Sequence, residues 1–196
     1  MEANHVVDRL QLDMKKTALV VIDMQKGIVG LQGAPYDSKT VLANVVKLAD
    51  LFREKEAFVV LVNVGSRDGK DMLRPLTDQP TALAGERPND WAVIVPELGP
   101  KATDHLVTKH QWGAFFGTDL DLQLRRRGID TIVLCGIATS IGVETTAREA
   151  YQHNYQQVFA EDAMTALNAE EHYHTLKYIC PRIGKIRKTD DIIASL

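Results

Sequence analysis

The stretch DTIVLCGIATSIGVETTAREA, residues 130–150, joins an apolar run to a helical pattern through a corner that contains glycine. The run at 130–136 is apolar almost throughout rather than alternating, which is typical of a strand covered on both faces. A helical pattern over 140–153 follows directly. A strand that leads straight into a helix predicts a parallel sheet with helices on both sides.

The same alternation of strands and helices continues along the rest of the chain. Further β-rich runs cover 17–23, 57–64, 105–109 and 155–160, and helical patterns cover 38–56, 118–127 and 169–179, with a last turn in TDDIIASL. Asp37 or Ser38 can cap the first of these helices. We therefore predict a single domain over 1–196, with a Rossmann-like three-layer α/β/α fold and a mainly parallel sheet of about six strands.

Residues 65–90 form the longest stretch without a strand or helix pattern, and they are rich in glycine, proline and charge. Long irregular connections inside a compact domain are usually binding loops or lids. We interpret this stretch as a surface loop or lid rather than as a linker between domains.

The composition of the 196 residues, 45% hydrophobic and 25% charged, is ordinary for a soluble globular protein. The formal net charge of -3 gives no indication of a nucleic-acid partner or an acidic membrane surface. The N-terminus lacks the apolar core of a signal peptide, and no apolar run is long enough to span a bilayer. Two cysteines, Cys135 and Cys180, cannot form a disulfide framework and are expected to be inert core thiols. We expect a cytoplasmic protein with no nucleic-acid and no membrane partner.

Three features lie at the carboxyl ends of predicted strands. Asp23 ends the first apolar run, Lys109 ends the run at 105–109, and the corner GIATSIG at 136–142 follows the run at 130–136. In an open parallel sheet, ligands bind beyond the carboxyl ends of the strands. Taken singly, Asp23 could be a helix cap and Lys109 a solvated end residue. Their coincidence with the corner favours a functional cleft that combines an acid, a cation and backbone N–H groups.

Three segments of the sequence together resemble one family of enzymes. They are ALVVIDMQKGIV (18–29), VTKHQWGAFFGTDLDLQLRRRGIDTIVLCGIAT (107–139) and EDAMTALNAEEH (161–172). The sequence resembles the isochorismatase-like hydrolase superfamily, which includes isochorismatases, nicotinamidases and N-carbamoylsarcosine amidases. The resemblance implies that Asp23 and Lys109 are the catalytic aspartate and lysine of the family.

Gly142 stands where the cysteine hydrolases of this superfamily have their nucleophilic cysteine. In those enzymes the thiolate attacks a carbonyl carbon, which glycine cannot do. Isochorismatases also have glycine there, and hydrolysis of their vinyl ether needs a proton donor instead of a nucleophile. The resemblance therefore implies a cofactor-independent hydrolase of a small molecule, with Asp23 as the general acid. Burial would raise the pKa of Asp23 and Lys109 would lower it, so the sequence leaves its protonation open.

The corner also departs from the isochorismatases, which usually have a tyrosine and a histidine at the positions of Ala138 and Ser140. The local run 137–139 resembles the cysteine hydrolases instead, so the substrate is left unassigned. Two alternatives stay open. One is a family member that binds a small molecule or acts as a scaffold without catalysis, and the other is an amidase that uses water in place of the thiol. Gly142 argues against the second.

The remaining site residues are candidates for the pocket wall and for contacts within the corner. An apolar pocket wall is expected from Ile28, Trp112 and Phe116, and the last two share a face if that segment is helical. They could equally fill a core or a subunit contact. The corner residues that are expected to contact substrate are Ala138, Thr139 and Ile141. Thr139 and Ser140 are interpreted as turn or cap residues, and the resemblance implies a cis peptide between Ile137 and Ala138.

No metal or organic cofactor is predicted. The region between Tyr36 and Arg67 lacks the histidine of the nicotinamidase metal site, and no phosphate loop or dinucleotide fingerprint occurs. His172 and His174 lie two apart on a predicted helix, so they face different directions and are expected at the surface. The resemblance also implies a homo-oligomer, a dimer or a tetramer.

Overall fold

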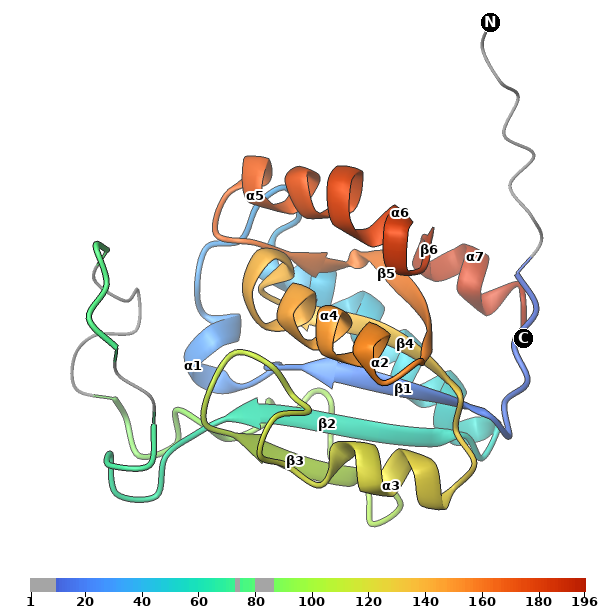
Figure 1. Ribbon diagram of the computed structural model, residues 1–196, viewed down its shortest axis with the longest axis horizontal. Helices are drawn as coiled ribbons and strands as arrows, with labels where there is room; N and C mark the ends of the chain where they lie inside the picture. The colour runs from blue at the N-terminus through green and yellow to red at the C-terminus, as the bar shows by residue number, and fades with distance from the viewer. Residues whose placement is uncertain (1–9, 73–74, 80–86) are drawn as a thin grey trace, which may run out of the picture.

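The structure, a computed structural model, describes residues 10–72, 75–79 and 87–196 of the chain (Figure 1). Six strands form one sheet in the order β3-β2-β1-β4-β5-β6, and every neighbouring pair is parallel. They are β1 (Thr17–Ile22), β2 (Phe58–Val64), β3 (His105–Lys109), β4 (Thr131–Ile137), β5 (Gln156–Thr165) and β6 (Lys185–Arg187). The predicted single α/β domain with a parallel sheet is confirmed.

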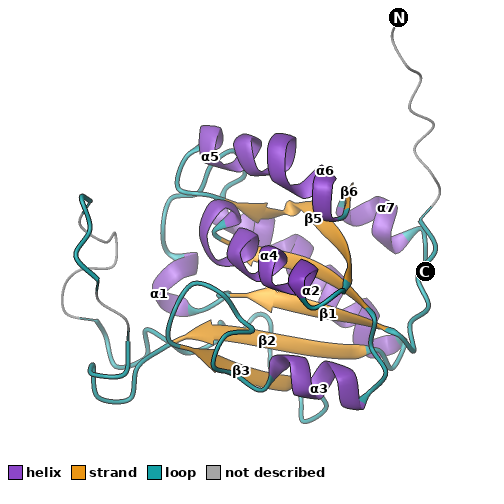
Figure 2. Ribbon diagram, viewed as in Figure 1, coloured by secondary structure: helices purple, strands orange, loops and turns teal. Residues whose placement is uncertain are grey.

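Helices cover both faces of this sheet (Figure 2). They are α1 (Lys26–Val29), α2 (Ser38–Glu54), α3 (Leu120–Arg126), α4 (Glu144–Gln152), α5 (Ala169–His174), α6 (Cys180–Ile183) and α7 (Thr189–Ile193), with π-helical turns η1 (Thr139–Val143) and η2 (Thr175–Ile179). α2 and α7 pack together against β5 on one face, whereas α4 and α6 do so on the other. The central strand β1 is buried throughout, which explains why its sequence is apolar rather than alternating.

The helix α2 shows how local sequence fixes an element. Asp37 caps it, because its Oδ1 atom accepts hydrogen bonds from the N–H groups of Lys39 (3.0 Å) and Thr40 (2.9 Å). One face of the helix is apolar and fully buried, and it carries Val41, Val45, Leu48 and Phe52. Of the two predicted caps, Asp37 is the one that the structure uses.

Some boundaries differ from the prediction. β5 runs on to Thr165 instead of ending at residue 160, because its register against β4 shifts between Leu134 and Gly136 and accommodates the charged pair at 161–162. The edge strand β6 has only three residues, too few for a recognisable pattern. In the predicted loop, the described residues 66–71 and 75–79 are exposed and contain no helix or strand, and residues 73–74 and 80–86 lie outside the described residues.

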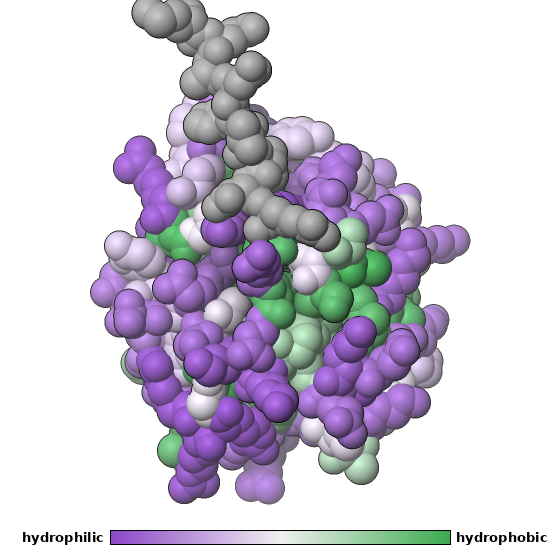
Figure 3. All heavy atoms as spheres, turned by 90° about the vertical axis from the view of Figure 1, so that its right-hand side faces the viewer, coloured by the Kyte–Doolittle hydropathy of each residue, from purple (hydrophilic) through white to green (hydrophobic). Residues whose placement is uncertain are grey.

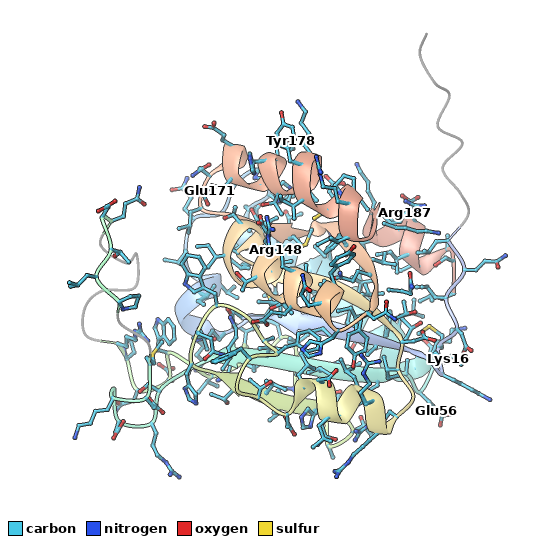
Figure 4. The ribbon with its side chains drawn as sticks, viewed as in Figure 1. Lys16, Glu56, Arg148, Glu171, Tyr178 and Arg187 are labelled. Atoms are coloured by element: carbon cyan, nitrogen blue, oxygen red, sulfur yellow. The ribbon has the colours of Figure 1, made fainter. Side chains whose placement is uncertain are left out.

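The two edges of the sheet differ in what they present. The arrows of β1 and β2 in Figure 1 point towards the side of α1, and Lys16 and Glu56, labelled in Figure 4, lie at the opposite, amino edge. Figure 3 views the molecule from that amino edge, where apolar and hydrophilic residues are both exposed. The predicted site residues therefore belong to the far side, at the carboxyl edge. No helix among the described residues is long and apolar enough to cross a membrane.

Candidate active site

Asp23 and Lys109 form a buried ion pair at the carboxyl edge of the sheet. Asp23 directly follows β1 and Lys109 ends β3, and both strands pair with β2. The Nζ atom of Lys109 lies 2.8 Å from Oδ2 of Asp23, and the two side chains are 2% and 6% exposed. Nζ also donates a hydrogen bond to the carbonyl oxygen of Trp112, at 2.6 Å. The predicted proximity of the acid and the lysine is thus confirmed.

Burial controls the protonation of Asp23. It raises the pKa of this carboxyl to about 6, against the opposite influence of the charge and hydrogen bond of Lys109. The Oδ1 atom is buried and has no hydrogen-bond partner among the described residues. Asp23 therefore holds a proton more readily than an exposed aspartate. Burial thus has a larger effect on the pKa of Asp23 than Lys109 has, which the sequence alone left open.

Gln25 supports this arrangement, although no motif in the sequence indicated a role for it. It is fully buried, and its amide donates to the carbonyl oxygens of Val64 (3.0 Å) and Trp91 (3.2 Å). Its Oε1 atom accepts from the N–H group of Val64 at 2.8 Å. Gln25 thereby joins the end of β2 to the segment that returns after the long loop. A glutamine two residues after a buried aspartate was the available signal.

The corner after β4 brings Gly142 to the ion pair. A Cβ atom at position 142 would lie 3.2 Å from Oδ2 of Asp23 and 3.3 Å from Nζ of Lys109. The corner begins at Gly136, where φ is 118° and a Cβ atom would overlap the carbonyl oxygen of Ile22, so only glycine fits. The peptide between Ile137 and Ala138 is cis, as the resemblance implied. The three predicted catalytic positions therefore meet at one point.

The next two residues of the corner are fastened to α5. The Oγ1 atom of Thr139 lies 2.8 Å from Nδ1 of His172, and the hydroxyl of Ser140 donates to Oε2 of Glu171 at 2.8 Å. Figure 4 shows Glu171 at the start of this upper helix. Neither hydroxyl caps η1. Of the predicted roles, turn or cap, the structure therefore shows the turn: both residues lie in η1 and bind the neighbouring helix α5 from within it.

The expectation that His172 lies at the surface is also wrong. Its side chain is fully buried, with the ring of Tyr36 edge-on at a centroid distance of 5.8 Å. Burial lowers the pKa of His172, which favours a neutral imidazole. The missed signal is helical spacing, because Thr175 and Leu176, three and four residues later, are also buried. His174 is exposed, as expected.

The other predicted pocket residues are placed less uniformly. Trp112 and Phe116 are 64% and 68% exposed, on a connection, 110–119, that forms no helix, so they share no helical face. The connection is held in an irregular form against α4, where a Cβ atom at Gly113 would overlap the carboxylate of Glu149. Ile28 is buried in α1, while Ile141 in η1 is half-buried. Neither aromatic ring fills the core.

The two cysteines are both free and buried. Burial raises the pKa of the Cys180 thiol to about 12 and that of Cys135 further still. Both thiols are thus buried, as predicted, and a raised pKa disfavours the reactive thiolate at neutral pH. Within the described residues, no group of three or more His, Cys, Asp or Glu side chains could hold a metal ion.

Comparison with known proteins decides the family. The family model described as the Isochorismatase domain matches residues 17–191. The chain belongs to the isochorismatase family. A family member from Bacillus subtilis (strain 168), the uncharacterized protein YwoC, is 57% identical over 189 residues, which cover 96% of this chain and 98% of YwoC.

Solved structures agree with this assignment. An isochorismatase family protein from Burkholderia thailandensis is 43% identical and superposes with a TM-score of 0.90, covering 95% of this chain and 97% of that one. The N-carbamoylsarcosine amidase of Thermoplasma acidophilum is 28% identical with a TM-score of 0.74, covering 89% and 97%. The chain is an isochorismatase-family hydrolase.

Proposed function

We propose that this family member hydrolyses a vinyl ether of a small molecule, without a cofactor and without a covalent intermediate. The observation that supports this is the state of Asp23, a buried carboxyl with a pKa of about 6, whose Oδ1 atom has no hydrogen-bond partner in the part of the chain that the structure describes. Gly142, which faces the Asp23–Lys109 pair, offers no side chain for nucleophilic attack. A proton donor is what vinyl-ether hydrolysis requires.

In the proposed reaction, protonated Asp23 gives its proton to the terminal methylene carbon of an enolpyruvyl ether. The resulting oxocarbenium ion takes up water at the ether-bearing carbon and loses a proton. The hemiketal then collapses to pyruvate and the free alcohol of the ring. In the net reaction, one water molecule cleaves the ether C–O bond, and the scheme requires no oxidant and no metal ion.

Lys109 stabilises the ionised form of Asp23 in this scheme. Its ammonium group already binds the carboxyl at 2.8 Å, so it stabilises the carboxylate that remains once the proton has left. The same attraction opposes protonation of Asp23, and burial outweighs it. Lys109 thus limits how far the pKa of the acid rises, which keeps proton transfer to the substrate favourable.

The proposed substrate contacts come from the corner and the two segments that flank it. The residues are Ile28, Trp112, Phe116, Ala138, Thr139 and Ile141. The hydroxyl of Thr139 is bonded to His172, so its backbone would make the contact. The carbonyl oxygen of Trp112 accepts a hydrogen bond from Lys109, which holds the backbone of Trp112 beside the ion pair.

The test is a turnover screen of the purified protein with enol-ether, amide and carbamoyl compounds. Asp23→Asn is the decisive variant, and Asp90→Asn is its matched control, because Asp90 also binds a lysine at 2.8 Å but is exposed. We expect enol-ether turnover that falls by about 100-fold or more in Asp23→Asn and stays unchanged in Asp90→Asn. Equal turnover by Asp23→Asn and the wild type would refute the proposal. Turnover of amides alone would favour the water-dependent amidase, and binding without turnover would favour the catalytically silent member.

A further inference from the structure

Thr146, on the first turns of α4, contacts two separate parts of the site. Its side chain is fully buried. The Oγ1 atom donates a hydrogen bond to the carbonyl oxygen of Gly142 at 2.7 Å and accepts one from the N–H group of Ala114 at 3.1 Å. The first bond is a common one for threonine in a helix, whereas the second reaches a distant segment of the chain. One hydroxyl therefore joins the Gly142 corner to the connection after β3.

That connection supplies a hydrogen-bond partner of the Lys109 ammonium group, in addition to Asp23. It contains the carbonyl oxygen of Trp112, which accepts a hydrogen bond from Nζ of Lys109. The connection contains no helix or strand, so its position depends on what it binds. Two adjacent N–H groups bind α4, that of Ala114 at Thr146 and that of Phe115 at Oε2 of Glu149 (2.9 Å). Trp112 thus lies two residues before Ala114, the first of the two residues that bind α4.

We propose that Thr146 is a positioning residue, which holds the connection that contains Trp112 against the Gly142 corner and so keeps the ammonium group of Lys109 on Asp23. The contacts form a closed ring. It runs from Gly142 to the ion pair, from Lys109 to Trp112, along the chain to Ala114, and through Thr146 back to Gly142. This assignment rests on the proposed function in so far as Asp23 and Lys109 carry the chemistry.

The electrostatics of Asp23 make the proposal measurable. Lys109 is the charged group that acts on Asp23, and it lowers the pKa of this carboxyl against the larger effect of burial. Thr146→Val keeps the shape of the side chain but removes the acceptor of the Ala114 N–H group. Because Ala114 is fully buried, that N–H group has to move to find another partner. Trp112 and the Lys109 ammonium then shift, while Asp23 stays buried, so the pKa of Asp23 rises.

The experiment measures the pKa of Asp23 directly, by carbon NMR of the full chain labelled at the aspartate carboxyl carbons, with Asp23→Asn to assign the signal. We expect Thr146→Val to raise the pKa by about one unit, which is a tenfold change in proton affinity. Thr146→Ser, which restores the hydroxyl, should return the wild-type value. Thr175→Val is the matched control. Thr175 is also a buried threonine, and its hydroxyl donates a hydrogen bond to Glu144 of α4 rather than binding the connection.

A pKa of Asp23 that moves no further in Thr146→Val than in Thr175→Val would overturn the proposal, as would a failure of Thr146→Ser to restore it. If Thr146→Val does not fold, the pKa of Asp23 is measured in Glu149→Met instead, because this variant removes the acceptor of the Phe115 N–H group. Its control is Glu149→Gln, and a pKa that moves no further in Glu149→Met than in this control would overturn the proposal. The readout needs no substrate. A shifted pKa without vinyl-ether turnover would therefore support the positioning role and refute the proposed function, and turnover without the shift would do the reverse.

Discussion

The pKa of Asp23 implies an unusual dependence of stability on pH. The folded protein binds this proton with a pKa of about 6, whereas an unperturbed aspartate has the value 3.8. Below pH 3.8 both states hold the proton and the contribution to stability is fully present. As pH rises from there through about 6, the unfolded chain loses its proton first, so the free energy of unfolding falls.

The size of the effect follows from the two pKa values. The difference is about 2 units, and each unit corresponds to about 1.4 kcal/mol, so the free energy of unfolding should fall by about 3 kcal/mol across this window. Asparagine at position 23 does not titrate. The difference between wild type and Asp23→Asn in the free energy of unfolding therefore isolates this group. It should fall by about 2 kcal/mol between pH 4 and pH 7, because the unfolded aspartate is already more than half ionised at pH 4.

Urea denaturation at intervals of pH measures this difference. Asp90→Asn is the control with the opposite sign, because binding to Lys26 lowers the pKa of Asp90. Its contribution is present above the unfolded pKa and is lost as pH falls, so the difference between wild type and Asp90→Asn should not decrease towards neutral pH. A difference between wild type and Asp23→Asn that stays constant from pH 4 to pH 7 would refute the reasoning about burial.

Three further predictions concern the same site and the assembly. Gly142→Cys should place a thiol beside Lys109, so iodoacetamide should label it about tenfold faster at pH 7 than a model peptide, and Lys109→Ala should slow that labelling. Mass spectrometry should show Cys135 and Cys180 unlabelled. A thiol at position 142 that reacts slowly would contradict the proposed influence of Lys109 on this site. Lys109→Met should raise the pKa of Asp23, and the pH at which enol-ether turnover falls should rise with it; an unmoved pH profile would exclude Asp23 as the titrating acid. Light scattering should give a mass of two or four times 21.8 kDa, and a value near 21.8 kDa would exclude the homo-oligomer.

The sequence was most informative where one local pattern determines one feature. An apolar run without alternation predicted the buried strand β1, and the position of Asp23 and Lys109 at the ends of β-rich runs predicted where their side chains lie. Both conclusions follow from the topology, because β1 and β3 flank β2 and their carboxyl ends meet beside each other. Nothing more than strand–helix alternation was needed to place them.

The sequence was least informative where contacts between distant segments determine the position of a side chain. His172 carries a polar side chain, yet the hydroxyl of Thr139 and the ring of Tyr36 provide a buried place for it. Trp112 and Phe116 have helical spacing, yet their segment follows the surface of α4 because the N–H groups of Ala114 and Phe115 bind there. Local propensity cannot anticipate such bonds, since each partner lies 30 or more residues away.

The identity of residue 142 determines which proton transfer suits this site. A cysteine there would need Asp23 to accept its proton, so the aspartate would have to be ionised at the start of the reaction. A vinyl ether needs the opposite, an aspartate that is protonated at the start. A pKa of about 6 makes both forms available near neutral pH. A Cβ atom at position 142 would lie 3.0 Å from Cγ2 of Ile22 and 3.2 Å from the carboxyl of Asp23, so a thiol would occupy the space next to the acid. Glycine leaves that space to substrate or water, and this is why we assign Asp23 the role of acid rather than base.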